Sequence, residues 1–383
     1  MEVSPSRPLF PSADRSLHLD HAGVAPISTP VVDAIARFSR EAVEEPAMRY
    51  PYWEARAEEV RSACACLAGT RSRQVAFVKN TSEAISFVAE GLDWRQGDVV
   101  ITVDEEFPSN VYPWRGLERL GVEVRQIPAS AVLGDLGQLS AALDGPVRLV
   151  AVSAIAYATG DRRALAPLAD LCRNRGALLV VDAIQALGAV EMNMDGDGVD
   201  ALAADGHKWM CAPEGAGFLA LSDRLLDRIR PSQLGWKSVI ESGTYYPYRF
   251  ELRRDAARME AGSLNLMAIH ALGAAVDLLL DVGMPTVERR VIGLAREFEE
   301  HCRRRGYRVL GAREESGRSP VESGIVTFVP ESDPERVRQE LWGLGVVSKA
   351  RHGGLRLAPH HYQDSRDVEG FFERLERAEA AAR

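Results

Sequence analysis

The segment Val180-Val181-Asp182-Ala183-Ile184-Gln185 ends an apolar run, residues 178–181, and places an acid directly after it. A second segment, Asp205-Gly206-His207-Lys208-Trp209, follows another short apolar run, residues 201–204. Continuous apolar runs of this length are typical of strands buried on both faces of a parallel sheet. Because the carboxyl ends of such strands share one edge, where ligands bind, we expect Asp182 and Lys208 to meet there. The spacing between these two residues leaves room for a crossover between neighbouring strands.

Around these segments, strand-like runs alternate with helical patterns from about residue 55 to residue 222. The predicted strands are residues 75–79, 99–103, 122–127, 149–154, 178–181, 201–204 and 217–221. The predicted helices are residues 81–91 and 163–175. This alternation predicts an α/β fold with a mainly parallel sheet covered by helices on both faces.

The pattern changes after about residue 262 and predicts a small α+β unit. Its predicted helices are residues 286–306, 334–344 and 365–381, and its first strand is residues 324–329. We therefore expect an N-terminal arm (1–18), a large domain (19–261) and a small C-terminal domain (262–383). Residues 234–260 show no clear period and are predicted to form a long loop, a class of segment that is often functional.

Composition narrows the class of protein. The chain has 383 residues, 46% of them hydrophobic, and a net charge of −9, which disfavours a general nucleic-acid-binding surface. The five cysteines are widely spread and do not resemble a disulfide framework, nor do we expect a metal site. No run of about 18 apolar residues exists, so we expect no membrane association and a cytoplasmic location.

An acid and a lysine at neighbouring strand ends are the two groups that pyridoxal 5′-phosphate (PLP) requires. The lysine amine binds the cofactor covalently, and the acid pairs with its protonated pyridine nitrogen. A third segment, Lys79-Asn80-Thr81-Ser82-Glu83, lies between a strand and a helix. Hydroxyls and free backbone N–H groups at a helix start favour a phosphate, although a plain helix cap explains the same residues.

Several further segments, in this order along the chain, carry a resemblance to a known family. They are Leu19-Asp20-His21-Ala22-Gly23, Asn80-Thr81-Ser82-Glu83-Ala84, Asp104-Glu105-Glu106-Phe107-Pro108-Ser109-Asn110, Asp182-Ala183-Ile184-Gln185, Gly206-His207-Lys208-Trp209, Glu260-Ala261-Gly262-Ser263 and Leu355-Arg356-Leu357. Together they resemble the class V aminotransferase and cysteine desulfurase family of fold-type I PLP enzymes. The resemblance implies a large domain with a sheet of the seven-stranded type, a small C-terminal domain and an amino-acid substrate.

The resemblance implies a role for each matching residue. Lys208 matches the lysine that holds PLP as a Schiff base, and Asp182 matches the acid on the pyridine nitrogen. Gln185 matches the residue that donates to the ring hydroxyl. Arg356 matches the arginine that binds the substrate carboxylate, a task that suits a planar guanidinium.

Other expectations concern the surroundings of the ring. Thr81, Ser82 and His207 match positions on the phosphate side. Phe107 stands where many desulfurases carry a histidine stacked on the ring, and Tyr157 stands where they often carry an asparagine.

The resemblance further implies a homodimer whose active sites lie at the interface. Trp236 and Ser263 would then reach the phosphate of the partner. His21 and His352 are the candidates for the substrate side.

One departure from the family bears on the reaction. Cysteine desulfurases attack the substrate sulfur with a cysteine on a loop shortly before the carboxylate-binding arginine, but residues 350–356 contain none. We therefore expect a C–S lyase that works by β-elimination. Transamination is the second hypothesis for the reaction, and epimerisation at Cα is the third. A non-catalytic PLP-binding scaffold is the alternative outside the enzymes. A dinucleotide-binding dehydrogenase is disfavoured because no Gly-x-Gly-x-x-Gly turn follows an early strand.

Overall fold

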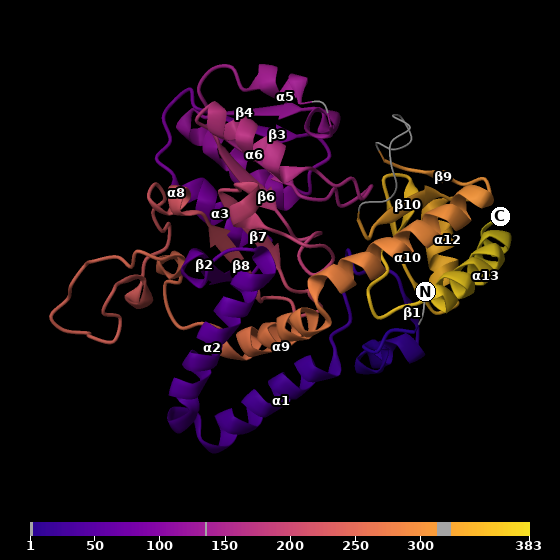
Figure 1. The fold of residues 1–383 in the computed structure, drawn as a ribbon, viewed down its shortest axis with the longest axis horizontal. Helices are drawn as coiled ribbons and strands as arrows, with labels where there is room; N and C mark the ends of the chain where they lie inside the picture. Colours follow the sequence, from indigo (N-terminus) through magenta and orange to yellow (C-terminus); the bar gives the residue numbers. More distant parts are fainter. Residues whose placement is uncertain (1–2, 135, 312–322) are drawn as a thin grey trace.

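The structure, a computed structural model, describes residues 3–134, 136–311 and 323–383. A seven-stranded sheet lies at its centre, in the order β2-β8-β7-β6-β5-β3-β4 (Figure 1). The strands are β2 (Val75–Val78), β3 (Val99–Val103), β4 (Glu123–Ile127), β5 (Val147–Ser153), β6 (Leu178–Asp182), β7 (Ala201–Asp205) and β8 (Gly217–Leu221). Strand β8 runs antiparallel to β2 and β7, and all other neighbouring pairs in the sheet are parallel. The mainly parallel sheet is therefore confirmed, and every predicted strand is present.

Alternate residues of the central strands point to opposite faces of the sheet. In β6, Leu179 and Val181 belong to one apolar cluster, whereas Leu178 and Val180 belong to the cluster on the other face. Both faces are buried, so every residue of the strand is apolar until Asp182 ends it.

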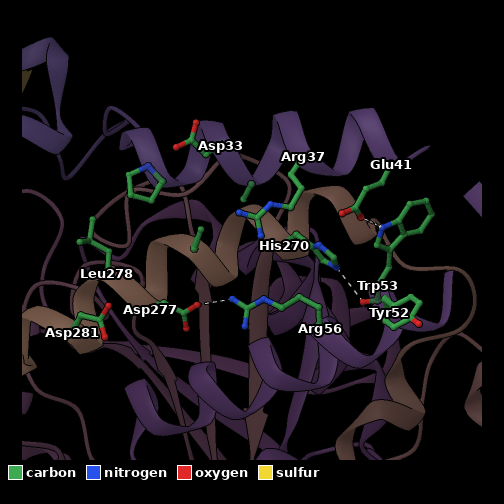
Figure 2. A pocket seen from close by; sticks show the side chains of 13 residues that line it. Asp33, Arg37, Glu41, Tyr52, Trp53, Arg56, His270, Asp277, Leu278 and Asp281 are labelled. Carbon is green, nitrogen blue, oxygen red and sulfur yellow. Dashed lines mark hydrogen bonds and ion pairs between the residues drawn. The ribbon is translucent and has the colours of Figure 1, made fainter. Parts of the chain in front are cut away.

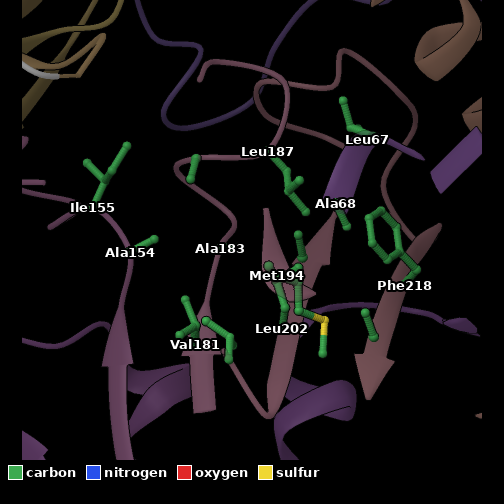
Figure 3. Packing of buried hydrophobic residues seen from close by; sticks show 14 of the residues in the cluster. Leu67, Ala68, Ala154, Ile155, Val181, Ala183, Leu187, Met194, Leu202 and Phe218 are labelled. Atoms are coloured by element: carbon green, nitrogen blue, oxygen red, sulfur yellow. The ribbon is translucent and has the colours of Figure 1, made fainter. Parts of the chain in front are cut away.

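Helices cover both faces of the sheet. One face is covered by α2 (Pro46–Ala68), α6 (Leu165–Asn174) and α9 (Leu266–Val282), and the other by α3 (Thr81–Gly91), α4 (Tyr112–Arg115) and α8 (Asp223–Leu226). Figure 3 shows side chains on the first face, where Ala68 of α2 lies near Phe218 of β8.

Three long helices lie outside the sequence-based assignments: α1 (Thr29–Glu44), α2 and α9. Helix α9 packs against both α1 and α2, and it also belongs to the large apolar cluster under the sheet. A helix enclosed in this way is apolar over most of its circumference, which removes the period that sequence analysis depends on. The remaining elements are α5 (Gly137–Ala142), α7 (Met194–Asp197) and the 3-10 helices η1 (Arg7–Leu9), η2 (Pro11–Asp14), η3 (Ser72–Gln74), η4 (Pro108–Asn110), η5 (Gly116–Leu120), η6 (Ala129–Val132), η7 (Trp236–Ser238) and η8 (Ala256–Met259).

The C-terminal part is an antiparallel sheet in the order β12-β13-β10-β9, packed against three helices. Its elements are α10 (Met284–Arg304), β9 (Arg308–Val309), β10 (Val326–Val329), α12 (Pro334–Gly343), β11 (Val346–Val347), β12 (Lys349–Arg351), β13 (Gly354–Leu357) and α13 (Ser365–Ala382). The α+β character predicted for this part is confirmed, with α10 beginning two residues earlier than expected.

The N-terminal segment is joined to this C-terminal part. Strand β1 (Leu17–His18) pairs in parallel with β11, and Asp20 forms a bridge with Ala358. The division into residues 1–18, 19–261 and 262–383 stays a prediction. Residues 234–260, with η7 and η8 near the two ends, project from the sheet on the side opposite the C-terminal part (Figure 1).

In the described ranges, no single helix has both the length and the apolar composition to cross a membrane. Helices α9 and α10 have this length and composition only when they are taken together, and a bend of 85° separates them.

A buried ion pair fixes α2 to the segment that follows the 234–260 loop. Arg61 donates to both oxygens of Glu260, at 2.5 and 3.1 Å, and Glu260 also accepts from the backbone N–H of Phe77 at 2.8 Å. The side chains of Arg61 and Glu260 are 5% and 4% exposed. Removing one partner of such a pair strongly lowers the free energy of unfolding, because the remaining charge would be buried without a counter-ion.

Replacing Glu260 with Gln is expected to lower the free energy of unfolding by about 3–5 kcal/mol. The matched control is Glu58→Gln, which removes a second partner of Arg61 whose side chain is 63% exposed; its cost should stay below about 1 kcal/mol. Urea unfolding followed by circular dichroism measures both. Equal losses in the two variants would contradict the structural role of Glu260.

Candidate active site

Asp182 and Lys208 lie at the same edge of the sheet because β6 and β7 are parallel neighbours. Asp182 is the last residue of β6 and is 2% exposed. Its Oδ1 accepts a hydrogen bond from the N–H of Ile184 at 3.0 Å, and its other oxygen makes none with the described residues. Burial raises the pKa of Asp182 to about 6, while the charge of Lys208 opposes the shift.

Lys208 follows β7 in a tight turn and is 8% exposed. Burial lowers its pKa to about 8, and the charge of Asp182 acts in the opposite direction. The Nζ atom lies 5.4 Å from the ring centroid of Phe107. The lowered pKa leaves more of this amine unprotonated near neutral pH than in an exposed lysine, and the unprotonated form is the one that a nucleophilic or proton-accepting lysine needs.

The side chain of Gln185 is fixed behind this pair. Its Oε1 accepts from Trp209 Nε1 at 2.8 Å, and its Nε2 donates to the carbonyl of Ala22 at 3.0 Å. One hydrogen of the Nε2 group remains for a ligand, which agrees with the donor role expected of this residue.

A buried hydroxyl without a partner lies at the start of α3. Thr81 is 4% exposed, and its Oγ1 makes no hydrogen bond with the described residues. Asn80 caps the helix by accepting from the N–H of Glu83, and Ser82 shares a 2.7 Å hydrogen bond with Ser109. An unpaired buried hydroxyl at a helix N-terminus can donate a hydrogen bond to a ligand. The helix dipole favours an anionic oxygen as the acceptor.

His207, the remaining residue expected on the phosphate side, directly precedes Lys208. Its Nδ1 lies 2.9 Å from Oδ2 of Asp205, the last residue of β7, but makes no hydrogen bond with the described residues.

Three aromatic rings line the approach to Lys208. Phe107 packs edge-on against Tyr157 with centroids 5.4 Å apart, and Tyr157 packs edge-on against His352 at 5.9 Å. His352 Nε2 lies 4.0 Å from Glu105 Oε2. The rings therefore connect the lysine with the β12–β13 hairpin of the C-terminal part.

Arg356 projects from β13 into the same region and is 2% exposed. Its guanidinium donates to Asp20 Oδ1 at 2.6 Å and to the carbonyl of Tyr157 at 2.8 Å, while Nε has no partner among the described residues. Burial lowers the pKa of this arginine and Asp20 opposes the shift. N–H groups of the Arg356 guanidinium, among them Nε–H, therefore remain free to bind a substrate carboxylate. Asp20 is not among the predicted site residues, because nothing in the sequence joins it to Arg356, 336 positions away.

His21 requires a correction. It is fully buried, its Nδ1 lies 2.7 Å from the carbonyl of Ala358, and its Nε2 lies 2.8 Å from the hydroxyl of Tyr362. Both ring nitrogens are thus engaged within the protein, and none is left for a substrate. His21 is a packing residue, and His352 is the histidine that remains at the mouth of the site.

The structure of the single chain places Trp236 and Ser263 at the surface, at the two ends of the 234–260 loop. Trp236 is 40% exposed and contacts Lys237 and Tyr245. Ser263 is exposed. Their expected role concerns a partner subunit and stays a prediction.

These residues fit PLP as the resident cofactor. The buried carboxylate of Asp182 suits a protonated pyridine nitrogen, and the amine of Lys208 suits the aldehyde. The unpaired hydroxyl of Thr81 suits the phosphate.

A separate hollow of about 550 Å³ lies between α1, α2 and α9 (Figure 2). Arg56 pairs there with Asp277 at 2.5 Å, and Trp53 donates to Glu41 at 2.7 Å. None of the predicted site residues lines it, and much of its polar lining is paired internally.

Comparisons with known proteins agree with this geometry. Residues 17–336 match the profile of the family described as Aminotransferase class-V. A probable cysteine desulfurase of Methanothermobacter thermautotrophicus is 29% identical over 94% of this chain and 94% of its own length. The isopenicillin N epimerase of Streptomyces clavuligerus is 26% identical over 83% of each chain.

Two solved structures are similar in fold. The apo form of a cysteine desulfurase from Thermococcus onnurineus superposes with a TM-score of 0.87 at 25% identity, covering 100% of this chain and 98% of the other. A cystine C–S lyase in complex with its reaction product, cysteine persulfide, has a TM-score of 0.88 at 22% identity, covering 97% and 99%. At that identity the second likeness concerns the fold alone.

The pH dependence of cofactor attachment tests the assignment of Lys208. Only an unprotonated amine attacks the aldehyde, so the rate at which apoprotein and PLP develop visible absorbance should rise with pH and be half-maximal near pH 8. Lys208→Ala should develop no such band at any pH. A midpoint above pH 10, as for an exposed lysine, would refute the buried-amine assignment.

Thr81→Val tests the phosphate position. Removing a hydrogen bond to a charged group should weaken PLP binding by roughly 10- to 100-fold and leave the binding of pyridoxal, which lacks the phosphate, unchanged. The control is Ser86→Ala in the same helix, whose hydroxyl bonds to the carbonyl of Ser82. An equal loss for PLP and pyridoxal would place Thr81 away from the phosphate.

Proposed function

This chain belongs to the aminotransferase class V family of PLP-dependent enzymes, and we propose that it is a C–S lyase. In the reaction that we propose, an amino acid with sulfur on Cβ loses that sulfur by β-elimination. The relative and the two solved structures named for cysteine desulfuration or cystine cleavage support sulfur amino acids as the substrate class.

The observation that carries the proposal is the absence of a thiol on the β12–β13 hairpin. The hairpin includes Arg356, and the family resemblance implies that a desulfurase cysteine would lie shortly before this arginine, yet residues 350–356 contain no cysteine. Four of the five cysteines are buried, and the exposed one, Cys66, lies on α2. A mechanism that forms a persulfide on the enzyme lacks its nucleophile, whereas β-elimination needs none.

PLP supplies the electron sink for bond breaking at the substrate Cα. In the proposed reaction, Arg356 holds the α-carboxylate and Lys208 Nζ accepts the proton from Cα. The Cβ–S bond then breaks, and sulfur leaves with the bonding electrons and takes up a proton as a thiol. Asp182 would keep a negative charge toward the pyridine nitrogen, and Phe107, whose ring centroid lies 5.4 Å from Lys208 Nζ, would help to exclude water from the bound cofactor.

His352 is our candidate for the residue that donates a proton to the departing sulfur. Its side chain is 34% exposed and lies within reach of Glu105, so it is able to exchange protons with solvent. The three-carbon remainder is released and hydrolysed to pyruvate and ammonia.

We also propose that the active enzyme is a homodimer, as the family resemblance implies, and that it is located in the cytoplasm. The 234–260 loop supports an interface, because it exposes several large apolar side chains: Ile240, Tyr245, Tyr246, Tyr248 and Phe250. Trp236 and Ser263 would approach the partner's phosphate from this loop.

The reaction is tested by mixing the holoenzyme with L-cysteine, L-cystine and S-substituted cysteines while assaying pyruvate. Pyruvate should form without any keto acid, and Lys208→Ala should reduce its rate by about 10²–10⁴-fold. Turnover only with a keto acid would identify an aminotransferase instead. Formation of the D-amino acid would identify an epimerase, and alanine in place of pyruvate a desulfurase.

A further inference from the structure

The hairpin that lacks the thiol carries two arginines. Strands β12 and β13 pair with Arg351 opposite Gly354, so the turn between them is His352-Gly353. Both turn residues have positive φ values, 48° and 73°, as a type I′ hairpin turn requires. A tight two-residue turn fixes the register of the strands and thereby the direction of every side chain on them.

Arg351 and Arg356 lie on the same face of this sheet. Lys349 pairs directly with Arg356, and residues two apart on a strand share a face, so Arg351 lies diagonally across from Arg356. The opposite face carries Leu355 and packs into the apolar cluster with α12 and α13. Arg351 is thus directed to the side on which Arg356 contacts Asp20 and Tyr157.

The two arginines differ in their partners. Arg356 is held by Asp20 at 2.6 Å, whereas the guanidinium of Arg351 donates only to the adjacent carbonyl of Ala350, at 3.0 Å, among the described residues. No carboxylate of the described chain lies within ion-pair distance of Arg351. Its charge also acts unfavourably on Arg356, whose pKa it helps to lower. A half-buried cation that repels its neighbour and lacks a counter-ion is stabilised once an anion binds.

We propose that Arg351 binds an anionic group at the end of the substrate side chain, so that the preferred substrates are S-substituted cysteines whose substituent ends in a carboxylate or another oxyanion. This inference rests on the proposed C–S lyase function. Diagonal neighbours in an antiparallel pair are about 7–8 Å apart, which suits one anion on Arg356 and a second a few bonds further along the substrate.

A matched pair of substrates tests the inference: S-carboxymethyl-L-cysteine and S-carbamoylmethyl-L-cysteine, which are nearly equal in size and differ in charge. The wild type should prefer the acid in kcat/KM by roughly 10- to 100-fold, the worth of a hydrogen-bonded charge pair. Arg351→Gln should bring the ratio close to 1 by slowing the acid alone. Arg351→Lys should retain part of the preference.

Arg338→Gln is the matched control, because Arg338 lies on α12 of the same C-terminal part and pairs with Glu335; its ratio should equal that of the wild type. Unchanged cofactor absorbance and melting temperature in Arg351→Gln would show that the variant folds. A preference for the acid that survives Arg351→Gln overturns the proposal.

A binding measurement separates this inference from the lyase function. L-Glutamate and L-glutamine have no sulfur to eliminate, so their affinities are read from the change in cofactor absorbance. Arg351→Gln should weaken L-glutamate by roughly 10-fold or more and leave L-glutamine unchanged. If no compound yields pyruvate but this difference appears, the lyase function fails and the anion site stands. If the variant shows no charge-dependent loss in either measurement, the anion site is overturned.

Discussion

The parallel pairing of β6 with β7 is the constraint on which the site depends. It brings Asp182 and Lys208 to one edge of a sheet that is buried on both faces. Burial then acts on the two groups in opposite directions, raising the pKa of the acid to about 6 and lowering that of the amine to about 8. Because desolvation disfavours both charges, it moves the two pKa values toward each other, and a cationic ring beside Asp182 would favour the charged form of that acid.

The second constraint is the attachment of the N-terminal segment to the C-terminal part. Strand β1 pairs with β11, and Asp20 holds Arg356 by a 2.6 Å ion pair. The arginine therefore enters the site already oriented and partly neutralised. Arg351, on the same face without such a carboxylate, retains its full charge for a ligand. In the proposed function, this difference assigns the α-carboxylate of the substrate to Arg356 and the end of its side chain to Arg351.

Neutral histidines hold these parts together beneath the site. His21 bonds to Ala358 and Tyr362, and His360 Nε2 lies 2.8 Å from the carbonyl of Trp209, next to Lys208. Burial lowers the pKa of His360 to about 4, so the ring is neutral at physiological pH and acts as a hydrogen-bonding packing residue. His360 therefore belongs to the core of the protein.

The sequence by itself determined the alternation of strands and helices and the residues that end β6 and β7. Strands that are buried on both faces can be recognised from a short stretch of sequence, because all their residues are apolar. The acid and the lysine that follow them can be recognised in the same way. It did not determine the enclosed helix α9, whose apolar character is nearly uniform, or the pairing of Asp20 with Arg356, which are 336 positions apart. Tertiary structure alone decided that His21 is buried and that Arg351 faces the site, because the accessibility of a side chain and its neighbours depend on segments that meet only in the folded chain.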